Sequence, residues 1–265
     1  LHTEARITYE QPSYSWSRPH QHWTKPKTVL LTGATGFIGR FLLQELLQKT
    51  DATVYCLVRS ATNGRQQLQQ SLRKNIPNIG SFDHRIKPLI GDLTLPEMGL
   101  TQRQFEYLAE NVDVIYHIAA NVNLFYPYAA LKPTNIVGTQ SVLTLASQSK
   151  LKPVHYVSTL DVFESLATTS PSIIYENDSI TQGIGISGGY AQSKWVAEQL
   201  ITRAATAGIP ICIYRPGMVS GHTQTGLCNP TDLMCRFLSS IIQLKSVPNL
   251  NWAIDMTPVD YVSQA

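Results

Sequence analysis

The stretch TVLLTGATGFIGRFLLQELL, residues 28–47, decides the fold. Its first five residues form a short apolar run typical of a buried strand, and the residues after Phe37 repeat apolar side chains at helical spacing. Between these two runs, Gly33, Gly36 and Gly39 make a G-x-x-G-x-x-G turn. Glycine accepts positive φ angles and lets the backbone approach a ligand closely. The stretch therefore predicts a strand, a tight turn and a helix.

The same alternation continues along the chain. Further strands are expected at ATVYCLVR, IKPLIGD, VDVIYHIAA, PVHYVST and PICIYRPG, with helices at NIVGTQSVLTLASQS and AQSKWVAEQLITRAATAG between them. Apolar strands that alternate with helices indicate a parallel sheet covered on both faces. We therefore predict an α/β fold, a doubly wound Rossmann-type parallel sheet with helices on both faces, followed by a partial C-terminal substrate lobe.

Three regions are expected along the chain. Residues 1–27 are rich in proline and polar residues and predict a linker or arm, pinned to the body by Trp16 and Trp23. Residues 28–220 are predicted to form the dinucleotide-binding domain. Residues 221–265 are predicted to hold part of a substrate-binding lobe and a returning Rossmann segment, with LMCRFLSSIIQL as a packed helix. The chain stops at what looks like the start of a helix.

Composition excludes several classes of protein. The chain has 265 residues, 43% of them hydrophobic and 15% charged, which is typical of a globular protein. A net charge of +3 without a basic run argues against nucleic acid as a partner. No apolar stretch approaches the ~18 residues that cross a bilayer. The four cysteines lack metal-ligand spacing, and Cys56 and Cys212 lie in strand-like runs. We therefore expect no metal site, buried free thiols at these two positions and a cytoplasmic protein.

The glycine turn predicts a bound dinucleotide. The helix that begins near Phe37 directs its free N–H groups and positive dipole end at the turn, where a pyrophosphate binds. Arg59 stands about 20 residues beyond Gly39, where NAD enzymes carry an acidic residue for the ribose hydroxyl. An arginine pairs instead with a 2′-phosphate, which predicts NADP(H). Around the turn, the residues expected to contact the cofactor are Thr32, Gly33, Thr35, Gly36, Phe37, Ile38 and Gly39.

Other cofactor contacts are expected where later strands end. In GDL, Asp92 is placed to accept from the adenine amino group, with Leu93 beside it. After HIAANV, small side chains leave room for the cofactor, and Pro216 and Gly217 of YRPG are expected to wall the nicotinamide pocket. His117 is interpreted as a packed strand residue. The cofactor contacts predicted after HI are Ala119, Ala120 and Asn121.

Tyr190 and Lys194 predict carbonyl chemistry. Residues four apart on a helix share a face, so the ammonium is expected beside the phenol. Together with the oxidised cofactor's cationic ring, it would lower the tyrosine pKa from its usual value of about 10. Both residues are also expected to contact the cofactor. Ser158 and Thr159 follow a strand, and Thr159 is expected to donate to the oxyanion that forms as hydride arrives.

These residues carry a family resemblance that covers the chain from Thr28 onward. The order TGATGFIG, GDL, HIAA, YVST, Y-x-x-x-K and RPG resembles the extended short-chain dehydrogenase/reductase family. HIAANVNLFYPYAALKPTNIVGTQSVL and SGGYAQSKWVAEQL are similar, more narrowly, to thioester reductase domains of nonribosomal peptide and polyketide synthases and carboxylic acid reductases. The resemblance implies an NADPH-dependent release of an acyl or peptidyl thioester as an aldehyde, which some relatives reduce again to an alcohol.

The resemblance also implies partners. The substrate would hang on the phosphopantetheine arm of a carrier protein, and residues 1–27 would be the linker that follows a carrier domain. The chain would then be part of a larger multidomain synthase and act as a monomer. Because relatives continue for roughly another hundred residues, the resemblance also implies that the substrate lobe is truncated here. Where the family often has a second basic residue for the 2′-phosphate, this chain has Gln69, which leaves Arg65 or Arg73 as alternatives.

Other functions remain open from the sequence. An epimerase, dehydratase or reductase that acts on a free small molecule such as a nucleotide sugar would carry the same Thr159, Tyr190 and Lys194. A non-catalytic nucleotide sensor would keep the glycines but would be expected to lose the tyrosine or the lysine. A domain that offloads by condensation is disfavoured by the intact Tyr190. The acyl chain and the number of hydrides delivered are not encoded in these motifs.

Overall fold

The structure of the chain is a computed structural model, and it describes residues 23–59, 66, 68–70, 79–164, 173–180, 185–249, 251 and 254–265. The predicted arm therefore falls largely outside the described residues, Trp16 included. Arg65 and Arg73, the alternatives for the second phosphate contact, also lie outside them.

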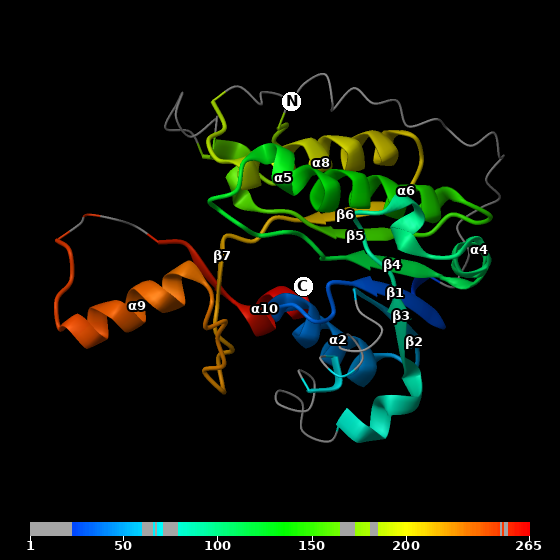
Figure 1. Cartoon of the computed structure of the whole chain (residues 1–265), viewed down its shortest axis with the longest axis horizontal. Coiled ribbons are helices and arrows are strands. Elements are labelled where there is room, and N and C mark those ends of the chain that lie inside the picture. The colour runs from blue at the N-terminus through cyan, green and yellow to red at the C-terminus, as the bar shows by residue number, and fades with distance from the viewer. Residues whose placement is uncertain are drawn as a thin grey trace.

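A six-stranded parallel sheet forms the centre of the molecule (Figure 1). Its strand order is β3-β2-β1-β4-β5-β6, so the chain starts in the middle, winds to one edge and then returns to wind to the other. The prediction of a doubly wound Rossmann-type sheet is confirmed. The strands are β1 (Thr28–Thr32), β2 (Thr53–Val58), β3 (Ile86–Ile90), β4 (Val114–His117), β5 (Val154–Val157) and β6 (Ile211–Tyr214).

Helices cover the two faces of this sheet. On one face lie α5 (Tyr128–Lys132), α6 (Gly138–Ser147) and α8 (Gly189–Thr206), and on the other lie α2 (Phe37–Lys49) and α10 (Val259–Gln264) (Figure 1). Each face has its own apolar core. Trp195 and Leu143 belong to the first core, and Leu43 and Val54 to the second. Because the strands are buried on both sides, they read as continuous apolar runs.

Short helices connect these elements. The connection before α6 is a π-helix, η4 (Pro133–Val137), which continues directly from α5. The helix α4 (Gln102–Asn111) precedes β4 and contributes Phe105 and Leu108 to the first core. The 3₁₀ helices are η2 (Ile79–Arg85), η3 (Pro96–Gly99) and η5 (Leu160–Phe163).

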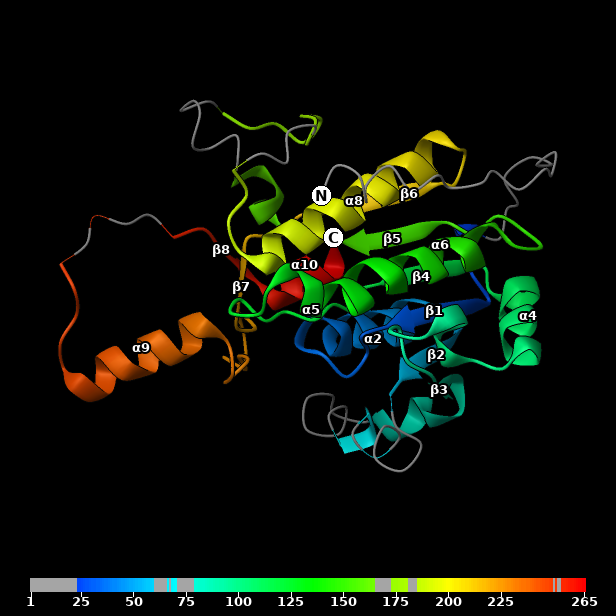
Figure 2. The same ribbon diagram turned by 45° about the horizontal axis from the view of Figure 1, so that its top comes forward.

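After β6 the chain leaves the main sheet and comes back. The strands β7 (Met218–Ser220) and β8 (Met256–Pro258) pair in parallel, and α10 then packs against α2. Between them, α9 (Leu233–Leu244) stands apart from the main sheet in both views (Figures 1 and 2). The prediction that this helix packs is wrong for the described residues, because Met234 is its one buried residue while Ile242 and Leu244 are about three-quarters exposed.

Cys212 also differs from its prediction. Cys56 is buried as expected, whereas Cys212 on the edge strand β6 is exposed. Its neighbours Ile211 and Ile213 pack against the first core, so Cys212 faces the opposite side of the sheet. Apolar sequence alone marks β6 as a strand, but burial of both faces depends on what covers the edge.

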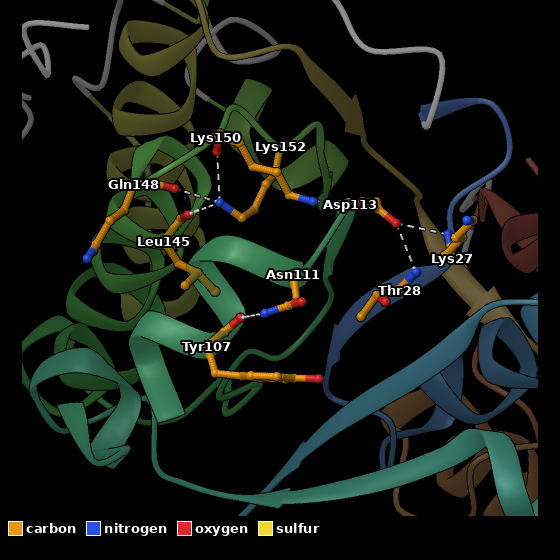
Figure 3. A network of polar contacts seen from close by, with 9 residues as sticks. All are labelled: Lys27, Thr28, Tyr107, Asn111, Asp113, Leu145, Gln148, Lys150 and Lys152. Atoms are coloured by element: carbon orange, nitrogen blue, oxygen red, sulfur yellow. Dashed lines mark hydrogen bonds and ion pairs between the residues drawn. The ribbon is translucent and has the colours of Figure 1, made fainter. Parts of the chain in front are cut away.

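A polar network closes the amino edge of the sheet (Figure 3). The Asp113 carboxylate, just before β4, accepts from Lys27 N at 2.9 Å and Thr28 N at 3.0 Å, and it pairs with Lys150 Nζ at 2.8 Å. The buried Lys152 ammonium donates to three carbonyl oxygens at the end of α6, those of Leu145, Gln148 and Lys150. These contacts fix the edge of the sheet that lies opposite the glycine turn.

In the described part of the chain, no helix has the length and apolar character to cross a membrane.

Candidate active site

The glycine turn lies directly against the end of β4. Gly33 has φ of +81°, which L side chains rarely adopt, and a Cβ placed there would come within 2.7 Å of Ala119 N. Gly36 N donates to Gly33 O at 2.9 Å and closes the turn. Gly39 lies over the same carbonyl group, so that a Cβ at this position would meet the backbone of Gly33. Gly33 and Gly39 thus permit backbone packing that no other residue allows.

The first turn of α2 is suited to bind an anion. Its N-cap, Gly36, has no side chain to accept from the free N–H groups, and the first turn contains no acidic residue. These N–H groups and the helix dipole favour a phosphate. Thr35 and Gly36 are exposed at this point, while Phe37 and Ile38 are half-buried. The cradle around Gly33 and the free helix end therefore fit the pyrophosphate of a dinucleotide.

Two residues mark the adenosine end of the predicted cofactor site. Arg59 follows β2, is exposed, and forms no ion pair with another described residue. Asp92 follows β3, and its Oδ1 accepts from the backbone and hydroxyl of Thr94, both at 2.8 Å. The second carboxylate oxygen of Asp92 remains for a ligand. Leu93 is buried against Gly138.

A buried hydrogen-bond chain joins the glycine turn to β4. Ala119 N donates to Thr32 Oγ1 at 3.3 Å, and Thr32 Oγ1 lies 2.8 Å from His117 Nδ1. His117 Nε2 lies 3.0 Å from Thr139 Oγ1, whose hydroxyl donates to Asn135 O. Since that hydroxyl proton is already used, Nε2 carries the histidine proton and Nδ1 accepts from Thr32. Burial lowers the pKa of His117 to about 3, so the ring stays neutral and serves as a packed strand residue.

The π-helix brings Asn135 between two parts of the candidate site. Its Oδ1 accepts from Asn121 N at 2.7 Å, and its Nδ2 donates to Ser193 Oγ at 2.9 Å. Ser193 Oγ in turn donates to Tyr190 O at 2.8 Å. Single-turn π-helices often occur at functional sites. Here the insertion positions an amide that ties the half-buried segment Ala119–Ala120–Asn121 to α8.

Tyr190 lies in the first turn of α8, at the carboxyl edge of the sheet. Gly188 is the N-cap with φ of +77°, and a Cβ on Gly189 would come within 2.5 Å of Tyr128 N. The pair GG in SGGYAQSK therefore lets the connection after β4 pack against the helix beside Tyr190. The phenol oxygen of Tyr190 makes no hydrogen bond with another described residue.

Lys194 is buried one turn later on the same face. Its Nζ donates to Val157 O at 2.7 Å and lies 4.2 Å from the centre of the Tyr156 ring. Burial lowers the pKa of Lys194 to about 7, and the charge of Glu198 opposes this shift. The ammonium is thus held by β5, within the core behind Tyr190.

The pKa of Tyr190 differs from the expectation. Burial raises this pKa well above the usual value, and the negative charge of Asp161 adds to the increase. Lys194, whose ammonium donates to Val157 O, does not reverse this increase in the protein alone. The phenol is therefore the stable form of Tyr190, and a phenol is a proton donor.

Thr159 lies across from this helix, at the start of η5. Its Oγ1 accepts from Asp161 N at 3.3 Å. Burial raises the pKa of Asp161, and the hydrogen bond with Thr159 partly opposes this increase. Pro216 O accepts from Leu160 N at 3.1 Å, so the half-buried Pro216 and Gly217 lie next to the same turn. Neighbouring Ser158 is buried, and its hydroxyl has no partner in the described chain.

Sequence reasoning missed four residues of this region. Asp161 had one available signal, since it stands two residues after Thr159 in YVSTLD. Ser193 and Glu198 lie on the same helix as Tyr190, but only the fold shows which side they face. Asn135 depends on the π-helix, which no local pattern indicates. Among the residues that the structure describes, no cluster of possible metal ligands occurs.

The fold and the glycine cradle define a dinucleotide-binding Rossmann protein, and comparison with known proteins refines this class. The family model described as Male sterility protein, an NAD-binding domain family, matches residues 31–265. A linear gramicidin synthase subunit of Brevibacillus parabrevis is 46% identical over 242 residues, which are 90% of this chain and 5% of that protein. The chain thus spans a small part of the curated relatives that it matches.

Two solved structures are similar over most of the chain. The terminal R domain from the myxalamid PKS-NRPS biosynthetic pathway has a TM-score of 0.91 and 39% identity, covering 99% of this chain and 67% of that one. The reductase (R) domain of a nonribosomal peptide synthetase from Mycobacterium tuberculosis has a TM-score of 0.75 and 34% identity, covering 90% and 61%. The chain belongs to this Male sterility protein family, among the terminal reductase domains of peptide and polyketide synthases.

Proposed function

We propose that the chain is the cofactor-binding part of an NADPH-dependent reductase, which releases an acyl or peptidyl thioester from a carrier protein as an aldehyde. One observation carries the chemistry: the free phenol of Tyr190, backed by the buried Lys194, lies at the same edge of the sheet as the glycine cradle. The similarity to terminal reductase domains supports a thioester as the substrate.

NADPH, when bound, supplies the hydride that adds to the thioester carbonyl carbon. The free N–H groups of α2 would hold its pyrophosphate, and Arg59 its 2′-phosphate. Tyr190 would donate its proton to the carbonyl oxygen as that oxygen gains charge, and Thr159 would stabilise the oxygen with a second hydrogen bond. The hemithioacetal would then break its C–S bond and release the aldehyde and the carrier thiol. Lys194 would stabilise the phenolate left on Tyr190.

The partners follow from this proposal. The substrate would be carried on the phosphopantetheine arm of an acyl or peptidyl carrier protein, within a larger multidomain synthase in which the reductase acts as a monomer. The relatives named above include one such synthase. All four cysteines are free, which supports a reducing cytoplasm as the location.

The test is NADPH oxidation by the complete protein that contains this chain, given an acyl thioester on a carrier protein. We expect Tyr190→Phe to lower kcat about 10²–10⁴-fold, the usual contribution of a positioned proton donor, with little change in the Kd of NADPH. Aldehyde or alcohol should appear in step with NADPH consumption. Tight NADPH binding without turnover of any thioester would contradict the proposal and favour a free small-molecule substrate or a nucleotide sensor.

A further inference from the structure

A largely buried ion pair joins α8 to the end of β6. Arg215 approaches Glu198 Oε1 with Nη2 at 2.6 Å and Nε at 2.8 Å. The guanidinium also donates from Nη1 to Glu176 O at 3.0 Å and stacks 5.0 Å from the centre of the Phe163 ring. Arg215 is thus held on three sides, and its charge-assisted hydrogen bond and ion-pair contact fix the position of the Glu198 carboxylate.

The other oxygen of this carboxylate is not used by Arg215. Glu198 Oε2 is fully buried and accepts no hydrogen bond in the described part of the chain. The Tyr156 hydroxyl is also buried and makes no hydrogen bond with the described residues. A buried carboxylate is costly unless it is paired, and Arg215 satisfies only one of its oxygens. The charge on Oε2 is therefore available to a second cation.

Lys194 is the candidate for this second cation. It precedes Glu198 by four residues on α8, so the two side chains share a face of the helix. Its two direct contacts, Val157 O and the Tyr156 ring, are both uncharged. Glu198 is the carboxylate whose charge acts on this ammonium. The titratable and charged groups around the pair are Tyr190 on α8, Tyr156 on β5, His117 on β4, Asp161 on η5 and Arg215 just after β6.

We propose that Glu198 is a positioning residue: fixed by Arg215, it supplies the buried counter-charge that keeps the Lys194 ammonium in place behind Tyr190. The inference rests on the proposed roles of Tyr190 and Lys194 in the reductase. It also links α8 to the segment that leads into Pro216 and Gly217, because Arg215 directly precedes them. The site then consists of a row of alternating charges, Arg215, Glu198 and Lys194, that ends at the phenol.

The kinetic test compares Glu198→Gln with Glu198→Asp in the complete protein. If Lys194 must be protonated, activity falls as pH rises through its pKa. Removing the counter-charge should move this alkaline limb of the kcat profile to lower pH by about one unit, with less than about threefold change in KM. Glu198→Asp keeps the charge and should leave the limb near its original place. Glu45→Gln, which removes an ion pair with Lys49 on α2, is the matched control. The inference would be overturned if the alkaline limb of the kcat profile did not move in Glu198→Gln, or if Glu198→Gln and Glu198→Asp moved it equally.

A second measurement needs no substrate. Carbon-13 labelled lysine gives an NMR titration of Lys194, assigned by its absence in Lys194→Met. We expect a lower titration midpoint in Glu198→Gln than in the wild-type protein. Arg215→Gln removes the cation that competes with Lys194 for Glu198, so it should raise the midpoint of the Lys194 titration. This variant tests the inference in the opposite direction, and it can be used if Glu198→Gln prevents folding. A midpoint unchanged in both variants would refute the role. If the wild-type protein failed to reduce thioesters, the proposed function would fall while this titration still decided the role of Glu198.

Discussion

At the scale of single residues, burial and a neighbouring negative charge act in the same direction on the pKa of Tyr190. Burial of the phenol raises its pKa and favours the protonated form, and Asp161 reinforces this preference. A donor that keeps its proton at neutral pH suits a reduction, in which the carbonyl oxygen gains negative charge and must be protonated. The direction of the pKa shift therefore agrees with aldehyde formation as the working direction.

Substitution of Asp161 tests how much its negative charge contributes to the raised pKa of Tyr190. Replacing Asp161 with Asn removes the negative charge that acts on Tyr190, so the phenolate becomes easier to form and the pKa of Tyr190 should fall. The measurement is the ultraviolet absorbance of the phenolate during titration, with Tyr190→Phe subtracted to isolate this tyrosine. Glu110→Gln is a suitable control, because Glu110 is an exposed residue of α4 and its charge is not a cause of the pKa shift of Tyr190 or of Asp161. An unchanged Tyr190 titration in Asp161→Asn would contradict the assigned cause.

Under the proposed function, Arg59 is expected to select NADPH over NADH. Hydrogen bonds to charged groups contribute about 1.5–3 kcal/mol, so Arg59→Ala should weaken NADPH binding roughly 10- to 100-fold. NADH lacks the 2′-phosphate, and its Kd should change little. Fluorescence titration of wild type and Arg59→Ala with NADPH and with NADH measures the change in Kd for each cofactor. Equal losses for both cofactors would show that Arg59 supports the fold or the adenine ring rather than the phosphate.

At the scale of elements, the first turn of α8 is positioned by a contact between backbones. Gly189 lies against the segment 126–128 so closely that any side chain would displace it. We expect Gly189→Ala to lower the free energy of unfolding by about 1–3 kcal/mol, the usual cost of overpacking, and to lower kcat by moving Tyr190.

Gly80→Ala is the matched control for this substitution. Gly80 has open space around its Cβ position and an ordinary φ, so the change should be near neutral. Chemical denaturation measures both variants. If Gly189→Ala were as stable and as active as Gly80→Ala, the close packing would not position the helix.

The local sequence pattern predicted the helices and strands, but not the contacts between them. The six strands and the α2 and α8 helices follow from periodicity and glycine placement over short windows, and all were predicted. Asn135 donates a hydrogen bond to Ser193, which lies 58 positions away in the sequence, and Arg215 donates one to Glu198, which lies 17 positions away. Contacts of this kind depend on which helix face meets which strand. The exposure of Cys212 and of α9 likewise depends on which elements cover them, and no local pattern contains this information.

At the scale of the whole molecule, the two edges of the sheet have different roles. The carboxyl edge carries the glycine cradle and Tyr190, and the amino edge carries the network around Asp113 and Lys152 (Figure 3). Burial alone would raise the pKa of Asp113, but its hydrogen bonds with Lys150, Lys27 and Thr28 together outweigh burial and lower this pKa. The network therefore stabilises the fold without touching the candidate site.

Asp113→Asn should separate stability from activity. Losing the charged partner of Lys150 and the two backbone N–H groups should cost about 1–3 kcal/mol near neutral pH. Because the folded-state pKa of Asp113 is lowered, its contribution is present above the unfolded pKa of about 3.9 and disappears as pH falls through the folded value. The two proteins should therefore converge in stability in acid.

Thermal unfolding across pH measures this difference, and NADPH affinity should stay unchanged. Asp51→Asn, at an exposed position between α2 and β2, is the control and should unfold like the wild-type protein. A difference between Asp113→Asn and wild type that persisted in acid would show that the contribution is not electrostatic.

The pairing of β7 with β8 has a consequence for how such chains diverge. The chain leaves the body at Ser220 and returns at Met256, and these two points lie on neighbouring strands. The free energy of closing a loop rises only slowly with its length, by about 0.6 kcal/mol for each doubling. The excursion between these strands can therefore be lengthened, shortened or exchanged while the register of the six central strands is preserved. Sequence changes that accumulate in this excursion therefore leave the Rossmann core intact.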